Sequence, residues 1–381
     1  MAKRKIAVEV GNHSVFNAPI SATVPLEELQ GTKCFALVQE GKEEPIPVQI
    51  ERCGNEARLW WIEQGLSLKE SRIYELASES VSGSQVAIAA KDGVAEVKIA
   101  GDSLGSLYFS KDVIRPYFHP LIGPFGKPVT RGYPMIPDVP GESSDHPHHK
   151  ALFVAFGDVN DTNNWGDGEG CGRQVVKDIK TSNGAVFGEI KMENEWVTSR
   201  GKKVVDEVRT LRFYNLPPSA RLIDLVVHFK AKEKDVKFGD TKEGGICSIR
   251  VASTMDVPRG GRIENSFGGI NEDETWGKRA HWCDYSGPVA GSWVGVTIFD
   301  HPENLRHPTF WHVRNYGLMT ANCFGLSYFK RDKSLDGSFI LWAGEELIFR
   351  YRIYIHPGNA LSGRVAEKYH NYLNPPKVTP Q

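Results

Sequence analysis

Short runs of β-forming residues follow one another along almost the whole chain, and this density of strands constrains the fold more than any other feature. Turn residues such as Asp92-Gly93 separate the runs. The clearest early runs are 5–10, 34–39, 46–51, 58–62 and 86–99. The clearest later runs are 186–196, 207–214, 221–230, 246–253, 293–299 and 338–356. This pattern predicts an all-β protein of antiparallel sheets.

The two groups of runs predict two domains. Residues 1–106 are expected to form a small N-terminal β-sandwich, and residues 107–381 a large antiparallel β-sandwich. The clearest helical pattern covers 360–373, where apolar residues repeat on one face. The final N-P-P-K-V-T-P-Q predicts a frayed end.

Charge and composition narrow the classes of partner. A formal net charge of -1 over 381 residues gives no field that would recruit nucleic acid or an anionic membrane. No uncharged apolar run approaches the roughly 20 residues needed to cross a bilayer. The six cysteines are dispersed without a C-x-x-C pair, which favours reduced thiols and a cytoplasmic location. We therefore expect a small-molecule or oligosaccharide substrate, with the oligomeric state left open.

Two strands carry the same three types of side chain on one face, because alternate residues of a strand point the same way. In R-P-Y-F-H-P the three are Arg115, Tyr117 and His119. In F-W-H-V-R-N-Y-G they are His312, Arg314 and Tyr316. These faces line a site or are simply solvated sheet faces.

Three histidines lie within four residues in D-H-P-H-H-K. Pro147 favours extended backbone, which would place His146 and His148 on one side of a strand and His149 on the other. Asp145 or Asp158 would then complete a metal site or orient an imidazole. Metal ligation, acid-base chemistry and a structural role all remain open.

The glycine-rich loop at 157–172 matches no cofactor motif. Its glycines give neither G-x-G-x-x-G nor a P-loop lysine, and its acidic residues fail the EF-hand pattern. No nucleotide cofactor is expected, whereas a divalent metal remains possible. Trp165 in this loop is interpreted as a wall of a binding site.

Further polar and aromatic clusters suit recognition of a neutral sugar, which uses aromatic faces and planar polar groups. Their alternative role is structural, since aromatic side chains of β-rich chains are mostly in the core. The candidate substrate-binding residues in these clusters are Asp240, Lys242, Trp276, Trp282, Asp284, Tyr285, His301 and Asn304.

Several of these stretches resemble the PmoA-like family, whose members are labelled methane oxygenase. The matching runs include R-P-Y-F-H-P-L-x-G-P-F-G-K-P-V-T-R ending at Arg131, D-H-P-H-H-K, and F-G-D-V-N ending at Asn160. Others are F-G-D-T-K-E-G, W-G-K-R-A-x-W-C-D-Y-S-G, D-H-P-E-N and W-H-V-R-N-Y-G. The resemblance adds Arg131, His149, Asp158 and Asn160 to the substrate-binding candidates. Methane oxidation itself is not expected, because that activity is embedded in a membrane.

The resemblance also implies a fold similar to the galactose-mutarotase-like supersandwich, which hosts sugar epimerases, polysaccharide lyases and glycoside hydrolases. We therefore expect a hydrolase, lyase or epimerase that uses His146 or His148 as general acid or base, because a near-neutral pKa suits proton transfer. Glu243 is the expected carboxylate partner, with His312 and Tyr316 also catalytic. Arg115 and Arg314 would bind a carboxylate or an oxyanion. The alternatives are a metal-dependent, oxygenase-like enzyme using His146 and His148, and a non-catalytic sugar-binding module.

Overall fold

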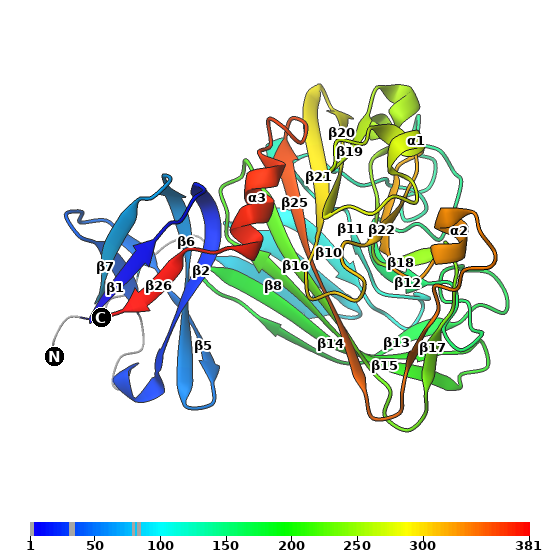
Figure 1. Ribbon diagram of the computed structural model, residues 1–381, viewed down its shortest axis with the longest axis horizontal. Coiled ribbons are helices and arrows are strands. Elements are labelled where there is room, and N and C mark those ends of the chain that lie inside the picture. The colour runs from blue at the N-terminus through cyan, green and yellow to red at the C-terminus, as the bar shows by residue number, and fades with distance from the viewer. Residues whose placement is uncertain (1–3, 30–34, 78–80, 82–84) are drawn as a thin grey trace.

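The computed structural model describes residues 4–29, 35–77, 81 and 85–381, and it confirms the all-β fold (Figure 1). Two antiparallel sheets form the small sandwich. The first contains, in order, β26 (Lys377–Pro380), β1 (Arg4–Glu9), β7 (Ser71–Ala77), β3 (Ala36–Gln39) and β4 (Pro45–Pro47). The second contains β2 (Val15–Pro25), β6 (Glu56–Leu66) and β5 (Gln49–Cys53). Trp61 and Tyr74 lie at 0% exposure in the core between them.

The large sandwich consists of two eight-stranded sheets. The first, which we call the site sheet, runs β22 (Phe310–Val313), β23 (Leu318–Asn322), β18 (Gly244–Arg250), β12 (Leu152–Phe156), β11 (Tyr117–His119), β10 (Asp102–Tyr108), β9 (Val94–Ile99) and β8 (Val86–Lys91). The second runs β13 (Arg173–Ser182), β14 (Phe187–Val197), β15 (Lys203–Tyr214), β16 (Arg221–Lys230), β25 (Glu346–Pro357), β21 (Ser292–Asp300), β20 (Trp282–Val289) and β19 (Arg262–Asn265). Phe118 of the first sheet packs against Phe213 of the second, so the main core lies between them.

The remaining elements are short. Strands β17 (Val236–Phe238) and β24 (Phe339–Leu341) form a two-stranded sheet. The α-helices are α1 (Asn271–Thr275), α2 (Leu326–Lys330) and α3 (Val365–Leu373). Within the ranges given above, no helix is long and apolar enough to cross a membrane.

The sheets divide between Ala77 and Val86, so the predicted boundary at residue 106 was wrong. Strands β8, β9 and β10 belong to the site sheet, and β10 pairs with β11 through Ser106 and His119. Val97 and Leu107 are buried in the large core. The apolar faces of these strands therefore pack in the core of the large sandwich.

The chain end is ordered by pairing and not frayed. Strand β26 lies beside β1, with Val378 opposite Val8 (Figure 1). The helix before it is shorter than predicted, because Gly358 and Arg364 adopt positive φ and residues 358–364 form turns. Helix α3 packs at the junction of the two sandwiches, where Lys368 Nζ donates to Asn17 O at 3.0 Å.

Candidate functional site

The three clustered histidines lie in a turn on the outer face of the site sheet. His146 has φ of 43°, and the His149 N–H donates to His146 O at 3.0 Å. The strand geometry predicted for this segment was therefore wrong, because left-handed backbone at His146 reverses the chain. The His146 and His149 rings stack with centroids 4.8 Å apart, and the His148 ring lies 4.3 Å from that of His149. All three imidazoles meet, not two.

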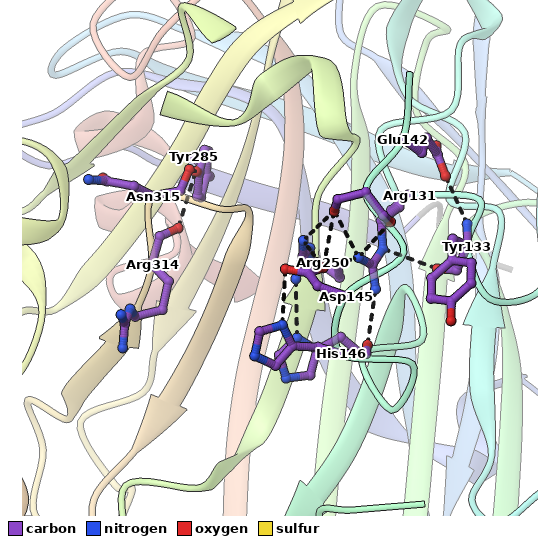
Figure 2. Close-up of polar contacts among 11 residues, drawn as sticks. Arg131, Tyr133, Glu142, Asp145, His146, Arg250, Tyr285, Arg314 and Asn315 are labelled. Atoms are coloured by element: carbon purple, nitrogen blue, oxygen red, sulfur yellow. Dashed lines mark hydrogen bonds and ion pairs between the residues drawn. The ribbon is translucent and has the colours of Figure 1, made fainter. Parts of the chain in front are cut away.

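Asp145 links this turn to two buried arginines (Figure 2). Its Oδ1 accepts from Arg131 Nη1 at 2.6 Å and from Arg250 Nη2 at 2.9 Å, and both arginines are fully buried. Its Oδ2 lies 3.0 Å from His146 Nδ1. Burial by itself would raise the pKa of Asp145, but the charge of Arg250 and the hydrogen bonds from His146 and Arg131 lower it to about 2. Asp145 is thus an ionised carboxylate that orients His146, one of the two roles considered for it.

Arg250 was not identified from the sequence. It ends β18, whose residues are all buried, and it is the only charged residue of G-G-I-C-S-I-R. An arginine at the end of an otherwise uncharged strand was the available signal, because such a cation needs a buried partner. Its guanidinium also lies 4.8 Å above the Tyr316 ring.

Tyr316 and Arg314 follow β22, in the turn before β23. Trp311 and Val313 of β22 point into the main core, which leaves His312 on the outer face at 2% exposure. The predicted alternation is thus confirmed for residues 311–313, but the strand ends at Val313, so Arg314 and Tyr316 do not share its face as predicted. Tyr316 stacks on His146, with centroids 4.9 Å apart and planes at 9°.

Tyr285 fixes the backbone of this turn and does not face the histidines. Its hydroxyl donates to Arg314 O at 3.2 Å and to Asn315 O at 2.8 Å (Figure 2). Tyr285 therefore holds the backbone of this turn, and its predicted contact with substrate stays a prediction.

Burial sets the ionisation of the site. It lowers the pKa of His148 to about 4, with a further contribution from Arg115, and that of His312 to about 3, assisted by the charge of Lys242. It raises the pKa of Tyr316. Near pH 7 these imidazoles are neutral and the phenol is protonated. The near-neutral pKa expected of His148 is thus not found.

Glu243 does not contact a histidine through its carboxylate. It forms an ion pair with the neighbouring Lys242 and is about half exposed. Its charge still raises the pKa values of His148 and Tyr316, so it lies within electrostatic range of both. The carboxylate partner of the histidine turn is Asp145, which corrects the prediction for Glu243.

Arg115 links the histidine turn to the glycine-rich loop at 157–172. Its guanidinium donates to Gly166 O at 2.6 Å and to His148 O at 3.3 Å, and it pairs with Asp167 at 2.6 Å. Lys150 pairs with the same carboxylate at 2.7 Å. Arg115 is only 1% exposed and anchors these loops, while its role in substrate binding stays a prediction.

Aromatic rings complete the outer face. The Trp165 ring packs against those of His148 and His149, with centroids 5.5 and 5.1 Å apart, and its role as a wall of a binding site stays a prediction. Tyr117 packs against the same small cluster as Tyr316. The Trp276 ring lies 6.2 Å from the His312 ring, so Trp276 also adjoins the site.

Other predicted residues lie apart from the histidines and have structural partners. Asp158 accepts from Asp161 N, Asn160 bonds Lys237 N, and Asp240 accepts from Ser327 N and Gly337 N. They close loops around β17, α2 and β24. Backbone groups of turns thus take up hydrogen bonds from all three side chains, and their role in substrate binding stays a prediction.

A second group of predicted residues lies on the opposite sheet, near α3. Trp282 is buried with Phe299, Asp284 pairs with His356, His301 accepts from Glu303 N, and Asn304 bonds Asp300. These residues share aromatic and polar types with the site but not its location. Sequence spacing alone did not separate the two sheets.

His119 is buried at 4% exposure, and neither ring nitrogen has a hydrogen-bond partner among the described residues. Burial lowers its pKa to about 4, and Glu142 is the carboxylate that partly opposes this. As for metals, no group of three or more His, Cys, Asp or Glu residues in the described part of the chain is arranged to hold an ion.

Fold and site together define a two-sandwich β-protein with a cluster of histidines on one outer sheet face. The family model of DUF6807, a family of unknown function, matches residues 95–370. The chain therefore belongs to this family, and the match includes every residue of the histidine turn. A search of curated proteins found no match.

Proposed function

We propose that this protein is a carbohydrate-active enzyme that moves protons on a sugar or small glycoside. The reaction takes place at the histidine site, which we define as Asp145, His146, His148, His312 and Tyr316. Support comes from one arrangement above all: an oriented, partly exposed imidazole stacked on a protonated phenol.

His146 is the general base. Its Nδ1 faces the ionised Asp145, so the favoured tautomer carries its proton on Nδ1 and leaves the Nε2 lone pair free. The ring is 40% exposed, and Nε2 has no hydrogen-bond partner within the described residues. A base held at one nitrogen and open at the other is what proton abstraction needs.

Tyr316 is the matching acid. Its phenol keeps its proton near neutral pH, because burial raises its pKa. It lies face to face with His146, so one substrate can reach both groups. His148 and His312 remain neutral and serve as hydrogen-bonding groups for hydroxyls.

This set favours an epimerase or lyase over a hydrolase. Most glycoside hydrolases use two carboxyl groups flanking the scissile bond. Here Asp145 and Asp167 are bound to buried arginines, which leaves Glu243 as the more exposed carboxylate near the histidines. An imidazole–phenol pair suits removal of a proton from carbon and its return or the loss of a leaving group.

The test is proton exchange in D2O. A panel of reducing sugars, glycosides and uronides is incubated with the protein, and NMR follows deuterium incorporation and product formation. We expect one class to react and the His146→Ala variant to lose about 10²- to 10⁴-fold in rate. Lys191→Gln, at an exposed position of β14 in the other sheet, is the control. Equal rates for wild type and His146→Ala on the reacting sugar would refute the proposal.

A further inference from the structure

An open pocket of about 800 Å³ adjoins the histidine site. Its walls come from α1, the loop that follows α1, Arg314, the end of α2, and Arg331, which follows α2. The lining residues are Glu272, Asp273, Trp276, Gly277, Lys278, Arg279, Arg314, Phe329, Lys330 and Arg331. This volume accommodates a small ligand.

The pocket is strongly cationic although the whole chain is nearly neutral. Five of its lining side chains are basic and two are acidic. One acid, Glu272, is paired with Arg314 at 2.8 Å. Lys278, Lys330 and Arg331 form no ion pair with any carboxylate in the ranges that the structure covers. Three cations therefore line the pocket without an ion-pair partner in the described part of the chain, against one further carboxylate, that of Asp273, and this excess of positive charge favours an anionic ligand.

Aromatic rings share the pocket with these cations. Trp276 and Phe329 meet edge to face at 5.5 Å. Gly277 has φ of 65°, and a Cβ there would lie 3.2 Å from Phe329 Cβ. Glycine therefore lets the loop pack closely on α2. An apolar ring face beside cations suits a saccharide that carries a charged substituent.

Two residues connect the pocket to the histidine site. Arg314 lines the pocket, and its guanidinium lies 5.4 Å from the centre of the Tyr316 ring. Trp276 lines it too, and its ring lies 6.2 Å from that of His312. A ligand seated in the pocket therefore extends toward the stacked His146 and Tyr316.

We propose that this pocket binds an acidic group, a carboxylate, sulfate or phosphate, carried by the saccharide substrate. That the saccharide is the substrate of the enzyme rests on the proposed function. Lys278, Lys330 and Arg331 hold the anion, and Arg314 lies between it and the proton-transfer groups. Specificity is thus for anionic over neutral sugars.

Binding measurements test the pocket without requiring turnover. Isothermal titration at low ionic strength compares D-glucuronate, D-glucose 6-sulfate and D-glucose 6-phosphate with D-glucose and with inorganic sulfate. We expect at least one anionic sugar to bind the wild-type protein more tightly than glucose and sulfate do. The Lys278→Gln/Lys330→Gln variant should lose about tenfold in affinity for it, or about 1.4 kcal/mol.

The control variant is Lys180→Gln/Lys191→Gln, which removes the same charge from the exposed pair opposite each other on β13 and β14. Its affinity should stay unchanged, and added salt should weaken binding to the wild type. Equal binding of glucose and all anionic sugars, or equal affinities in the two double variants, would overturn the inference. Sulfate binding as tight as that of any sugar would also overturn it, because the pocket would then recognise a free anion.

Failure of the proposed function gives a different result. If no panel sugar reacts but the lysine variant loses affinity for the anionic sugar, the pocket stands and the enzyme assignment falls. If a neutral sugar reacts and depends on His146, while no anionic sugar binds better than glucose, the enzyme assignment stands and the pocket falls.

Discussion

Two of the histidine–carboxylate pairs among the described residues have almost equal contact distances in very different surroundings. At the histidine site, His146 Nδ1 lies 3.0 Å from Asp145 Oδ2, and the two side chains are 40% and 37% exposed. Between β20 and β25, His356 Nε2 lies 2.9 Å from Asp284 Oδ1, and both side chains are fully buried. The contact distance therefore does not distinguish the pair proposed to act in catalysis from the fully buried one.

The two pairs differ in the surroundings of the ring nitrogen that does not face the carboxylate. The second ring nitrogen of His356 faces Pro357 O at 3.1 Å, and Thr297 Oγ1 lies 3.3 Å from the first. A Cβ at Gly295 or Gly363 would lie 2.2 or 2.1 Å from this ring, so the ring is tightly enclosed. The His146 side chain is instead 40% exposed, and its Nε2 has no hydrogen-bond partner among the described residues. A pair becomes available for chemistry when one nitrogen is oriented and the other is accessible.

The largest expected effect is on stability and concerns the buried pair. His356→Ala leaves the Asp284 carboxylate buried without its imidazole, so we expect a loss of about 3 to 5 kcal/mol in the free energy of unfolding. His146→Ala, on an exposed ring, should cost less than about 1 kcal/mol. Urea denaturation of both variants measures this. Similar losses for the two would remove the distinction drawn between the pairs.

The next effect is on catalysis. Tyr316→Phe removes the proposed acid but keeps the ring that stacks on His146. We expect turnover of the reacting sugar to fall about 100-fold, equivalent to about 2.7 kcal/mol in the barrier, with the melting temperature unchanged. Turnover at the wild-type rate would show that the phenol only packs.

The smallest effect is a pH dependence. The pKa of Asp145 is about 2 in the folded protein against an ordinary value of 3.8, so its contribution to stability is complete above pH 4 and is lost as the pH falls toward 2. Because the side chain is partly exposed, solvent screening limits this contribution to about 1 kcal/mol. Asp145→Asn should therefore flatten the fall in unfolding free energy between pH 4 and pH 2. An unchanged slope would argue against an ionised, paired Asp145.

Much of the fold could be predicted because strand alternation is a local signal. The apolar side of F-W-H-V placed Trp311 and Val313 in the core and His312 on the other face, as found. The domain to which a strand belongs could not be predicted in this way, because it depends on pairing between distant strands. Strands β8 and β9 precede the predicted boundary and β10 spans it, yet Val97 of β9 is buried in the large core.

The site was predicted in its residue types and less well in its contacts. The histidine turn, Tyr316 and Arg314 lie together, but the left-handed backbone at His146 could not be anticipated from a proline that favours extended structure. Arg250 and Asp145 are 105 residues apart, and their pairing depends on which sheet face each occupies. The same limitation grouped Asp284 with the site, although it lies in the opposite sheet.

The most direct test of the central claim concerns the two ring nitrogens of His146. Long-range proton–nitrogen NMR correlation of the uniformly labelled protein reports which nitrogen is protonated, with the signals assigned by their loss in His146→Ala. We predict a proton on Nδ1, facing Asp145, and an unprotonated Nε2, and we expect Asp145→Asn to change this distribution. A proton on Nε2 with a bare Nδ1 would contradict the assignment of His146 as an oriented base.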